Sequence, residues 1–215
     1  RFAFDGAPRY TNIGFSIGGI YAYSVFFWTP TFFIRTFDWT PAQSGIRFGA
    51  AVLVFGIAGT YFGGRLASSW MARGQMDALF RVAIFSMLML VPVAVLAPLA
   101  PNSTLALGGF GLVVLLFSMA ASVAPTALQI VAPNEFRGQA SSAFSLMSIV
   151  VGLGTGPTLI ALFTDRVFGS ADSLCYSLAI IGGATALGCA CVLSIGRLAF
   201  RDAVLVARDR WSSPS

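Results

Sequence analysis

The stretch GIAGTYFGGRLASSWMARGQMDALFR, residues 56–81, decides the fold of this chain. An apolar, glycine-rich run ends within it in a short polar hairpin that carries Arg65, Arg73 and Arg81, and the next apolar run begins at once. Two long apolar runs joined by a short arginine-containing loop are typical of two consecutive membrane spans. We therefore predict a membrane protein whose loop arginines indicate which side of the membrane each loop faces.

The composition of the whole chain agrees with this prediction. Of its 215 residues, 57% are hydrophobic and 10% are charged, whereas soluble domains carry roughly 25% charged residues. The net charge of +5 comes from arginines that lie mostly in loops beside apolar runs, so it reports membrane topology rather than nucleic-acid binding. The chain begins with Arg1 rather than Met and shows no cleavable signal peptide, so we expect it to be part of a longer protein.

Six apolar segments have about the 20 residues that a membrane-spanning helix needs. They are expected at about 12–33, 42–62, 82–99, 104–131, 138–163 and 174–195. The fold class is therefore an all-α membrane protein with a six-helix bundle over residues 12–197. A cytoplasmic approach (1–11) precedes the bundle, and a cytoplasmic tail (198–215) with apolar residues at helical spacing, typical of a short surface helix, follows it.

The arginines predict the orientation of these spans. If residue 1 lies on one side of the membrane and the chain crosses six times, that side holds ten arginines and the other side holds three. The ten are Arg1, Arg9, Arg65, Arg73, Arg81, Arg137, Arg197, Arg201, Arg208 and Arg210, and the three are Arg35, Arg47 and Arg166. Because cytoplasmic loops carry the excess of basic residues, both termini of the chain are predicted to be cytoplasmic.

In four of the six segments polar side chains recur at helical spacing and so define one face of the helix. The residues on these faces are Asn12, Ser16, Tyr23 and Phe27 in the first; Gln43 and Arg47 in the second; Ser118, Ser122, Pro125 and Gln129 in the fourth; and Ser141, Ser145, Ser148, Gly152 and Thr155 in the fifth. Such faces usually meet protein or a water-filled cavity rather than lipid, so these four segments are expected to line an interior, with the third and sixth peripheral. The order lining, lining, outer thus occurs twice, which predicts two inverted three-helix repeats as in secondary transporters.

The polar faces supply candidates for a substrate cavity, with packing between helices as the alternative for each. The candidates are Tyr23 and Phe27 as aromatic walls, Ser122 and Gln129 as hydrogen-bonding groups, Ser145 as a small polar contact, and Arg47 as a cation. Arg47 is the charged residue that lies furthest inside an apolar segment. Either it extends towards the outer surface, or it faces the cavity and attracts an anionic group.

Glycines form a second pattern, because small residues let membrane helices approach closely. The glycines expected to pack helices are Gly45, Gly49, Gly56, Gly59 and Gly63 on one face of the second segment, and Gly152 and Gly156 in the fifth. The pattern fits static packing, and it also fits a surface on which helices slide between two transport states.

The sequence offers little for catalysis or metal binding. It contains no His, and the apolar segments hold no pair of carboxylates. Cys175, Cys189 and Cys191, in or beside the last segment, are interpreted as small packing residues. We therefore expect no enzyme activity, no cofactor, no metal site and no nucleic-acid partner. A channel and a non-transporting scaffold or sensor are the alternatives to a transporter, and a proton-coupling carboxylate would have to lie outside this chain.

The hairpin GGRLASSWMARG resembles the cytoplasmic loop of the major facilitator superfamily, whose pattern is roughly G-x-L-a-D-R-x-G-R-R. Gly64, Leu66, Ala67 and Arg73 match in order, while Ser68 stands where the family has an aspartate. In the family this aspartate helps to close the cytoplasmic side, so the resemblance implies a weaker gating contact here. Degenerate copies of the loop are common in the second half of such transporters, which implies that this chain is the C-terminal half of a twelve-helix fold.

Most of the remaining chain is similar to the Spinster-like subfamily. The stretches WTPTFFIRTFDWTPAQSG and VAPNEFRGQASSAFSLMSIVVGLGTGPTLIALFTD follow the order of that half, with matches at Pro133, Arg137, Ala140, Gly154, Gly156, Pro157 and Asp165. The resemblance implies alternating-access transport, by symport or antiport, of an organic anion or an amphipathic lipid-like molecule across a bacterial inner membrane. The implied partners are the lipid bilayer, the N-terminal six-helix half and a small-molecule substrate. A drug or sugar-acid transporter of another subfamily is the alternative.

Overall fold

The structure, a computed structural model, describes residues 7–75, 77–131, 137–169 and 173–212. Over these residues the chain folds into α1 (Ala7–Phe37), α2 (Pro41–Ala72), α3 (Ala78–Leu96), α4 (Ser103–Val131), α5 (Arg137–Leu162), the short π-helix η3 (Phe163–Phe168) and α6 (Leu174–Ser212). The six α-helices each contain a segment long and apolar enough to cross a membrane. The predicted all-α fold with six spans is therefore confirmed.

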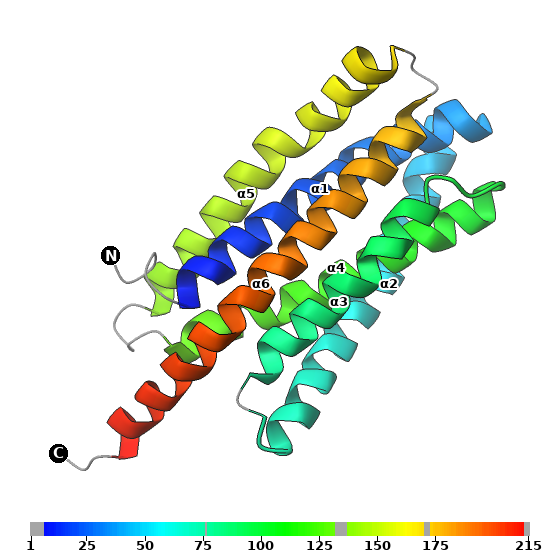
Figure 1. The fold of residues 1–215 in the computed structure, drawn as a ribbon. Coiled ribbons are helices and arrows are strands. Elements are labelled where there is room, and N and C mark those ends of the chain that lie inside the picture. Colours follow the sequence, from blue (N-terminus) through cyan, green and yellow to red (C-terminus); the bar gives the residue numbers. More distant parts are fainter. Residues whose placement is uncertain (1–6, 76, 132–136, 170–172, 213–215) are drawn as a thin grey trace.

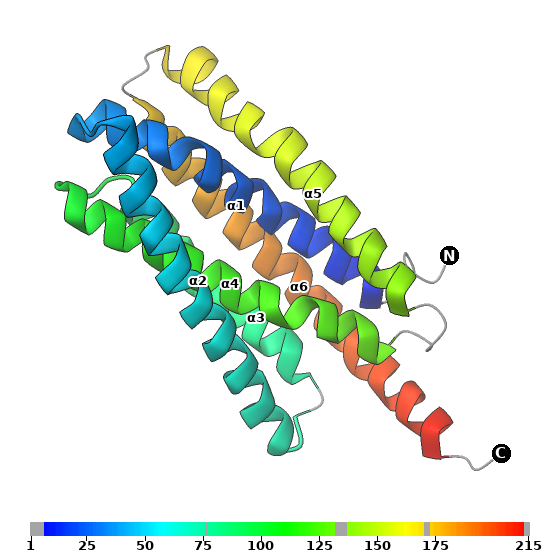
Figure 2. The same ribbon diagram turned by 180° about the vertical axis from the view of Figure 1, so that it is seen from behind.

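The helices form two layers (Figures 1 and 2). Figure 2 looks onto the front layer, in which α2, α4, α1 and α5 lie side by side in that order. The back layer consists of α3, packed on α4, and α6, packed on α1, with α3 and α6 in contact. The four helices predicted to line an interior are thus the front layer, and the two predicted to be peripheral are the back layer.

The arrangement repeats itself when α1–α3 is exchanged for α4–α6. In the first repeat α2 packs on α4 and α3 packs on α4, and in the second α5 packs on α1 and α6 packs on α1. This exchange of partners is expected of two inverted three-helix repeats, as predicted. The helices at the edges of the front layer, α2 and α5, are the least covered, with 17% of the most apolar part of each span buried against 44% to 50% in the other helices.

Two glycine pairs hold the edge helices close to the central helices. A Cβ added to Gly59 or Gly63 of α2 would collide with main-chain atoms of α4, and one added to Gly156 of α5 would collide with the main chain of α1. On Gly152 it would come 3.0 Å from the carbonyl carbon of Gly19 in α1. Only glycine allows backbones to approach so closely, so each edge helix is fixed to its neighbour by a matching pair.

Three other glycines of α2 do not share this close approach. A Cβ on Gly45 or Gly49 would meet no atom within 4 Å, and one on Gly56 would be in ordinary contact with Val114 at 3.8 Å. In the first turns of α2 the buried residues are Ser44, Phe48 and Ala51 instead. On the N-terminal side of Gly56, the face of α2 that contacts its neighbours is therefore no longer the glycine face. Within the described residues, Gly45 and Gly49 do not have the packing role that was expected of them.

The turn between α1 and α2 is fixed by a reciprocal cap. The Thr40 hydroxyl accepts a hydrogen bond from the Gln43 amide (3.2 Å), and the Gln43 side chain accepts one from the Thr40 amide (3.3 Å). Pro41 occupies the first turn of the helix, where its missing N–H costs nothing. Asp38 takes a left-handed backbone conformation (φ 53°) just before the cap. Together these features place the Trp39 ring next to Arg47, which lies in the second turn of α2.

The last helix is longer than expected. α6 continues without interruption from Leu174 to Ser212, so residues 198–212 are not a separate surface segment. Its final turns extend beyond the ends of the other helices (Figures 1 and 2). The sequence from 197 to 213 contains neither Gly nor Pro, so nothing in it favours ending the helix after the span.

Candidate functional site

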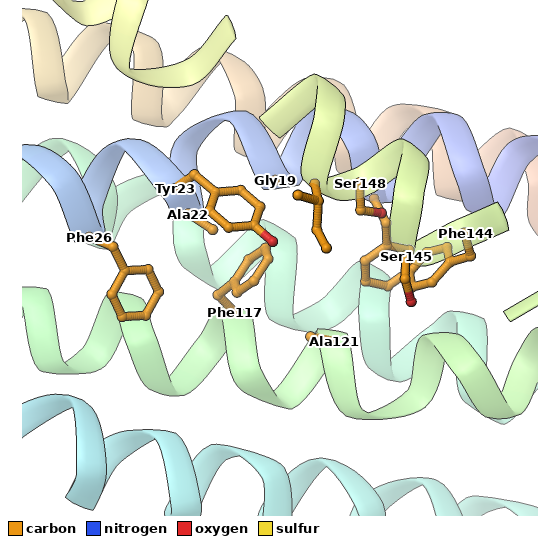
Figure 3. A pocket seen from close by; sticks show the side chains of 11 residues that line it. Gly19, Ala22, Tyr23, Phe26, Phe117, Ala121, Phe144, Ser145 and Ser148 are labelled. Atoms are coloured by element: carbon orange, nitrogen blue, oxygen red, sulfur yellow. The ribbon is translucent and has the colours of Figure 1, made fainter. Parts of the chain in front are cut away.

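A cavity of about 290 Å³ lies in the front layer between α1, α4 and α5 (Figure 3). This volume is close to the lower end of the range for small-molecule sites, about 300–1,000 Å³. Most of the lining is aromatic, and the rings belong to Phe15, Tyr23, Phe26, Phe117 and Phe144. The small residues Gly19, Ala22 and Ala121 and the side chain of Ile149 complete the apolar part.

The rings come from three helices and line the cavity along its length. The Phe15 and Phe144 rings meet edge to face, with centroids 5.8 Å apart, and join α1 to α5 near the end at which both helices begin. Figure 3 shows Phe26 at the opposite end of the row. Edge-to-face pairs are favourable beyond the area that they bury, so the aromatic wall is also a structural contact between the two helices.

Three hydroxyl groups interrupt this apolar lining. They belong to Tyr23, Ser145 and Ser148. The Ser148 hydroxyl is buried and has no hydrogen-bond partner within the described residues. The lining contains no charged side chain. Since an unpaired charge is costly to bury, the cavity suits an apolar group that can exchange a few hydrogen bonds.

The structure brings two of the predicted site residues together, because Tyr23 and Ser145 both line the cavity. Phe27 lies outside it, 60% exposed, with its ring against that of Trp28. Ser122 also lies elsewhere, donating to the Met119 carbonyl (2.9 Å) where Gly63 of α2 approaches. These two residues are placed at the surface and at a helix contact, respectively.

Gln129 lies towards the end of α4, beyond the cavity. Its side-chain nitrogen donates to the Ser141 hydroxyl of α5 over 3.4 Å. Both residues belong to polar faces identified in the sequence, and the bond links α4 to α5 on the side predicted to be cytoplasmic. Gln129 is therefore placed beside the cavity and not within its lining.

Arg47 does not line the cavity. Its side chain is exposed, and its guanidinium carbon lies 4.7 Å from the ring centroid of Trp39, in the turn before α2. A guanidinium within about 6 Å of a Trp face gains a favourable cation–π interaction. The placement supports the alternative in which Arg47 extends towards the outer surface.

The residues that resemble the superfamily loop are mostly helical. α2 continues through Gly64, Leu66, Ala67 and Ser68 to Ala72, and Arg73 is its C-cap. Ala67 is buried, whereas Ser68 is exposed. The loop itself is thus short, and the position at which the family has its aspartate lies on the exposed side of the last turns of α2.

One acidic residue that the sequence patterns do not single out, Asp77, is 4% exposed just before α3. One carboxylate oxygen binds Nε of Arg81 (2.9 Å) and the other binds Nε of Arg197 in α6. Burial opposes ionisation of this carboxyl, but the hydrogen bonds and charges of Arg197 and Arg81 outweigh it and lower the pKa of Asp77 below 3.8. The four-residue spacing to Arg81 was visible in the sequence, but Arg197 is 120 positions away.

Within the described residues, no three His, Cys, Asp or Glu side chains lie close enough together to hold a metal ion. Cys189 is buried at the contact of α6 with Gly18 of α1, which is a packing position.

Comparisons with known proteins agree with the fold. No protein-family model matches the sequence, and no curated protein matches it. Solved structures do match, among them two of a bacterial homolog of the human lysosomal transporter Spinster in an inward-facing conformation. The occupied form has a TM-score of 0.70 and 17% identity over 100% of this chain and 52% of that chain. The unoccupied form has a TM-score of 0.64 and 16% identity over 96% of this chain and 49% of that chain.

The chain therefore spans about half the length of the solved structures that it matches. At this level of identity the likeness concerns the fold. The six helices have the fold of about half of this solved Spinster homolog, in line with the six-helix half that the resemblance of the hairpin implied.

Proposed function

We propose that this chain forms one half of a secondary transporter that moves a small organic solute across a membrane by alternating access. The observation that carries the proposal is the cavity between α1, α4 and α5, in the front layer of an inverted-repeat bundle. In such transporters the substrate site lies at the interface of the repeats, near the middle of the membrane. The N-terminal six-helix half would cover the front layer and complete the site.

The lining of the cavity favours an amphipathic lipid-like substrate over an organic anion. Five aromatic rings and three hydroxyl groups, without a charged side chain, fit the apolar part of an amphipathic molecule. An organic anion would need a cation near its charged group, and Arg47 lies outside this cavity. The charged group of an amphipathic substrate would therefore be bound outside the cavity, and we place the hydrophobic part here.

The arginine distribution supports the orientation within this proposal. With both termini on the cytoplasmic side of a bacterial inner membrane, the Gln129–Ser141 contact and the Asp77 ion pairs lie near the cytoplasm. The cavity lining contains no Asp, Glu or His. Coupling to protons would therefore depend on a carboxylate of the other half, and a transport rate independent of a pH gradient would indicate uniport.

A matched pair of substitutions tests the proposal in the full-length protein. Ser145→Trp fills the cavity, whereas Leu146→Trp places the same ring on the neighbouring residue of α5, which is 65% exposed and does not line the cavity. We expect uptake of a lysolipid into proteoliposomes to fall about tenfold or more in the first variant, since misfit in a pocket has effects of this size, and to persist in the second. Equal uptake by the two variants would reject the cavity as the transport site.

The same preparation separates the rival functions. A scaffold or sensor would give no uptake of lysolipids, organic anions or sugar acids by the unmodified protein, although the protein is folded. A channel would give an electrical conductance far above the turnover of a transporter. Uptake of an organic anion but not of a lysolipid would reject the amphipathic substrate and leave the transport function intact.

A further inference from the structure

The ring of Tyr23 is held in an unusual position at the cavity wall. A Cβ added to Gly152 of α5 would lie 2.5 Å from Cδ2 and 2.9 Å from Cε2 of Tyr23, closer than real Cβ atoms come to other atoms. The ring therefore rests directly on the α5 backbone at Gly152. Tyr23 and Gly152 belong to different repeats, so the contact exists only because α1 and α5 pack together.

The backbone on that side leaves the ring no space. Gly19, one turn before Tyr23, also faces α5, and a Cβ on Gly19 would lie 3.4 Å from the Ser148 carbonyl oxygen and 3.8 Å from the Gly152 Cα. Tyr23 thus has two close backbones against its ring. The same ring lines the cavity, where Figure 3 shows it near Phe117. A group added at Gly152 meets both the Tyr23 ring and the carbonyl carbon of Gly19, and of these two the ring has the cavity to move into.

We infer that Gly152 is a specificity-determining residue. Because it has no side chain, the Tyr23 ring packs directly on its backbone, and this position of the ring sets the width of the cavity. The inference rests on the proposed function for its biological meaning, but the geometry does not depend on the substrate. A methyl group at position 152 moves the Tyr23 ring inwards and excludes wide groups from the cavity before narrow ones.

Two further glycines of α5 provide controls with the same substitution. A Cβ on Gly154 would meet no atom within 4 Å, so Gly154→Ala leaves the cavity unchanged. Gly156 instead faces the Ile20 carbonyl of α1, so Gly156→Ala pushes the two helices apart without touching Tyr23. The three positions separate an effect on the ring from an effect on helix packing and from the effect of an alanine in this helix.

The test measures the cavity directly, by thiol labelling. Ser145→Cys serves as the reporter in the full-length protein, with Cys175, Cys189, Cys191 and any cysteine of the other half replaced. The labelling rates of methyl and benzyl methanethiosulfonate are compared in proteoliposomes, where each reagent forms a mixed disulfide with the thiolate and releases methanesulfinate. We expect Gly152→Ala to lower the ratio of benzyl to methyl rate about tenfold, since one added methyl in a close-fitting pocket has effects of this size.

The controls give the inference a definite outcome. In Gly154→Ala the ratio of rates should equal that of the reporter alone, and an unchanged ratio in Gly152→Ala would overturn the inference. Tyr23→Ala should raise the ratio, and the double variant with Gly152→Ala should match Tyr23→Ala alone, because no ring remains to be displaced. If Gly152→Ala does not fold, Tyr23→Ala still decides, since an unchanged ratio there means that Tyr23 does not limit the cavity.

Labelling and uptake can fail independently. If Gly152→Ala changes the labelling ratio but the protein takes up no solute, the role of Gly152 in positioning Tyr23 stands and the transport function is rejected. Uptake that responds to Ser145→Trp while the labelling ratio ignores Gly152→Ala would retain transport and reject the role of Gly152.

Discussion

The two edges of the front layer are built alike, yet the cavity that three helices line lies at the α5 edge. At the α2 edge a space of about 520 Å³ is an open groove along the helix, lined by residues of α2 alone. Gly59 of α2 and Gly152 of α5 hold equivalent places, each where its helix meets the main chain of a central helix. The residues 11, 7 and 4 positions before each glycine are therefore equivalent in the two helices. They are Phe48, Val52 and Phe55 in α2, and Ser141, Ser145 and Ser148 in α5. The same backbone contact is therefore filled by large apolar side chains at one edge and by serines at the other.

The bulky residues close the α2 edge. The Phe48 ring packs against Phe26 of α1, with centroids 6.3 Å apart, and the Ser44 hydroxyl donates to the Pro30 carbonyl (3.0 Å). Between α1 and α4, beside Val25 and Val114, the enclosed space is only about 20 Å³. Where α5 carries serines, about 290 Å³ stays open. Large side chains of α2 thus accompany a packed contact with α1, whereas Ser145 and Ser148 of α5 line a candidate binding site.

Removing bulk from the closed edge should have the largest effect. Phe48 is 5% exposed, so Phe48→Ala leaves a cavity among α1 and α2, and we expect a loss of about 3 kcal/mol in stability. Thermal unfolding of the full-length protein in detergent measures it. Phe27→Ala, at a ring that is 60% exposed, should cost much less. Similar losses in the two variants would mean that Phe48 does not close this edge.

The back layer supports both edges and should affect stability without changing the cavity. Asp77→Asn removes the charge that holds Arg81 and Arg197, and we expect it to cost about 2 kcal/mol. Asp165→Asn, at an exposed carboxylate, is the control. The benzyl to methyl labelling ratio at position 145 should not change in Asp77→Asn, and a changed ratio would tie the back layer to the cavity.

The same carboxylate predicts a pH dependence with a definite sign. Because the folded-state pKa of Asp77 is lowered below 3.8, its contribution to stability is present above that value and is lost as the pH falls through the folded-state pKa. The stability difference between the unmodified protein and Asp77→Asn should therefore shrink below about pH 4. A difference that stays constant down to pH 2 would show that the fold does not lower the pKa of Asp77.

The sequence was sufficient for the architecture because the spans and their order depend on local composition and periodicity. Tyr23 and Ser145 were also found, since each lies on a polar face that does reach the cavity. Phe27 belongs to the same face as Tyr23, but a face extends along a whole helix while the neighbouring helices cross it and cover only part of it. Helical spacing therefore identified the face and could not identify the turn.

Other site residues gave no usable signal. Phe15, Phe117 and Phe144 are apolar residues in apolar spans, and the sequence does not distinguish a ring that lines a cavity from one that faces lipid. The Asp77 pairs depend on Arg197, whose proximity is a consequence of the folded back layer. Residue chemistry was visible in each case, but the contact between distant helices was not.

Converting one edge into the other sharpens the comparison. Ser148→Phe gives α5 the ring that α2 has at the equivalent Phe55, and it should fill the cavity and reduce lysolipid uptake about tenfold, with little loss of stability. Ser142→Phe places the same ring at an exposed position of α5 that does not line the cavity, so uptake should persist. If Ser148→Phe transports normally, the difference between the edges has no functional consequence.

The smallest effect is expected at Arg47, the charge of the closed edge. Its guanidinium rests on Trp39 outside the cavity, so Arg47→Ala should lose only the cation–π contact, about 0.5–1 kcal/mol at an exposed site. Uptake by proteoliposomes should change by less than about twofold, because the lost cation–π contact is with Trp39 and not with the solute. Arg47→Lys keeps a cation and should behave like the unmodified protein in both assays. A loss of anion uptake in Arg47→Ala that Arg47→Lys restores would instead place Arg47 on the solute path, and the closed edge would then contribute the charge that the open edge lacks.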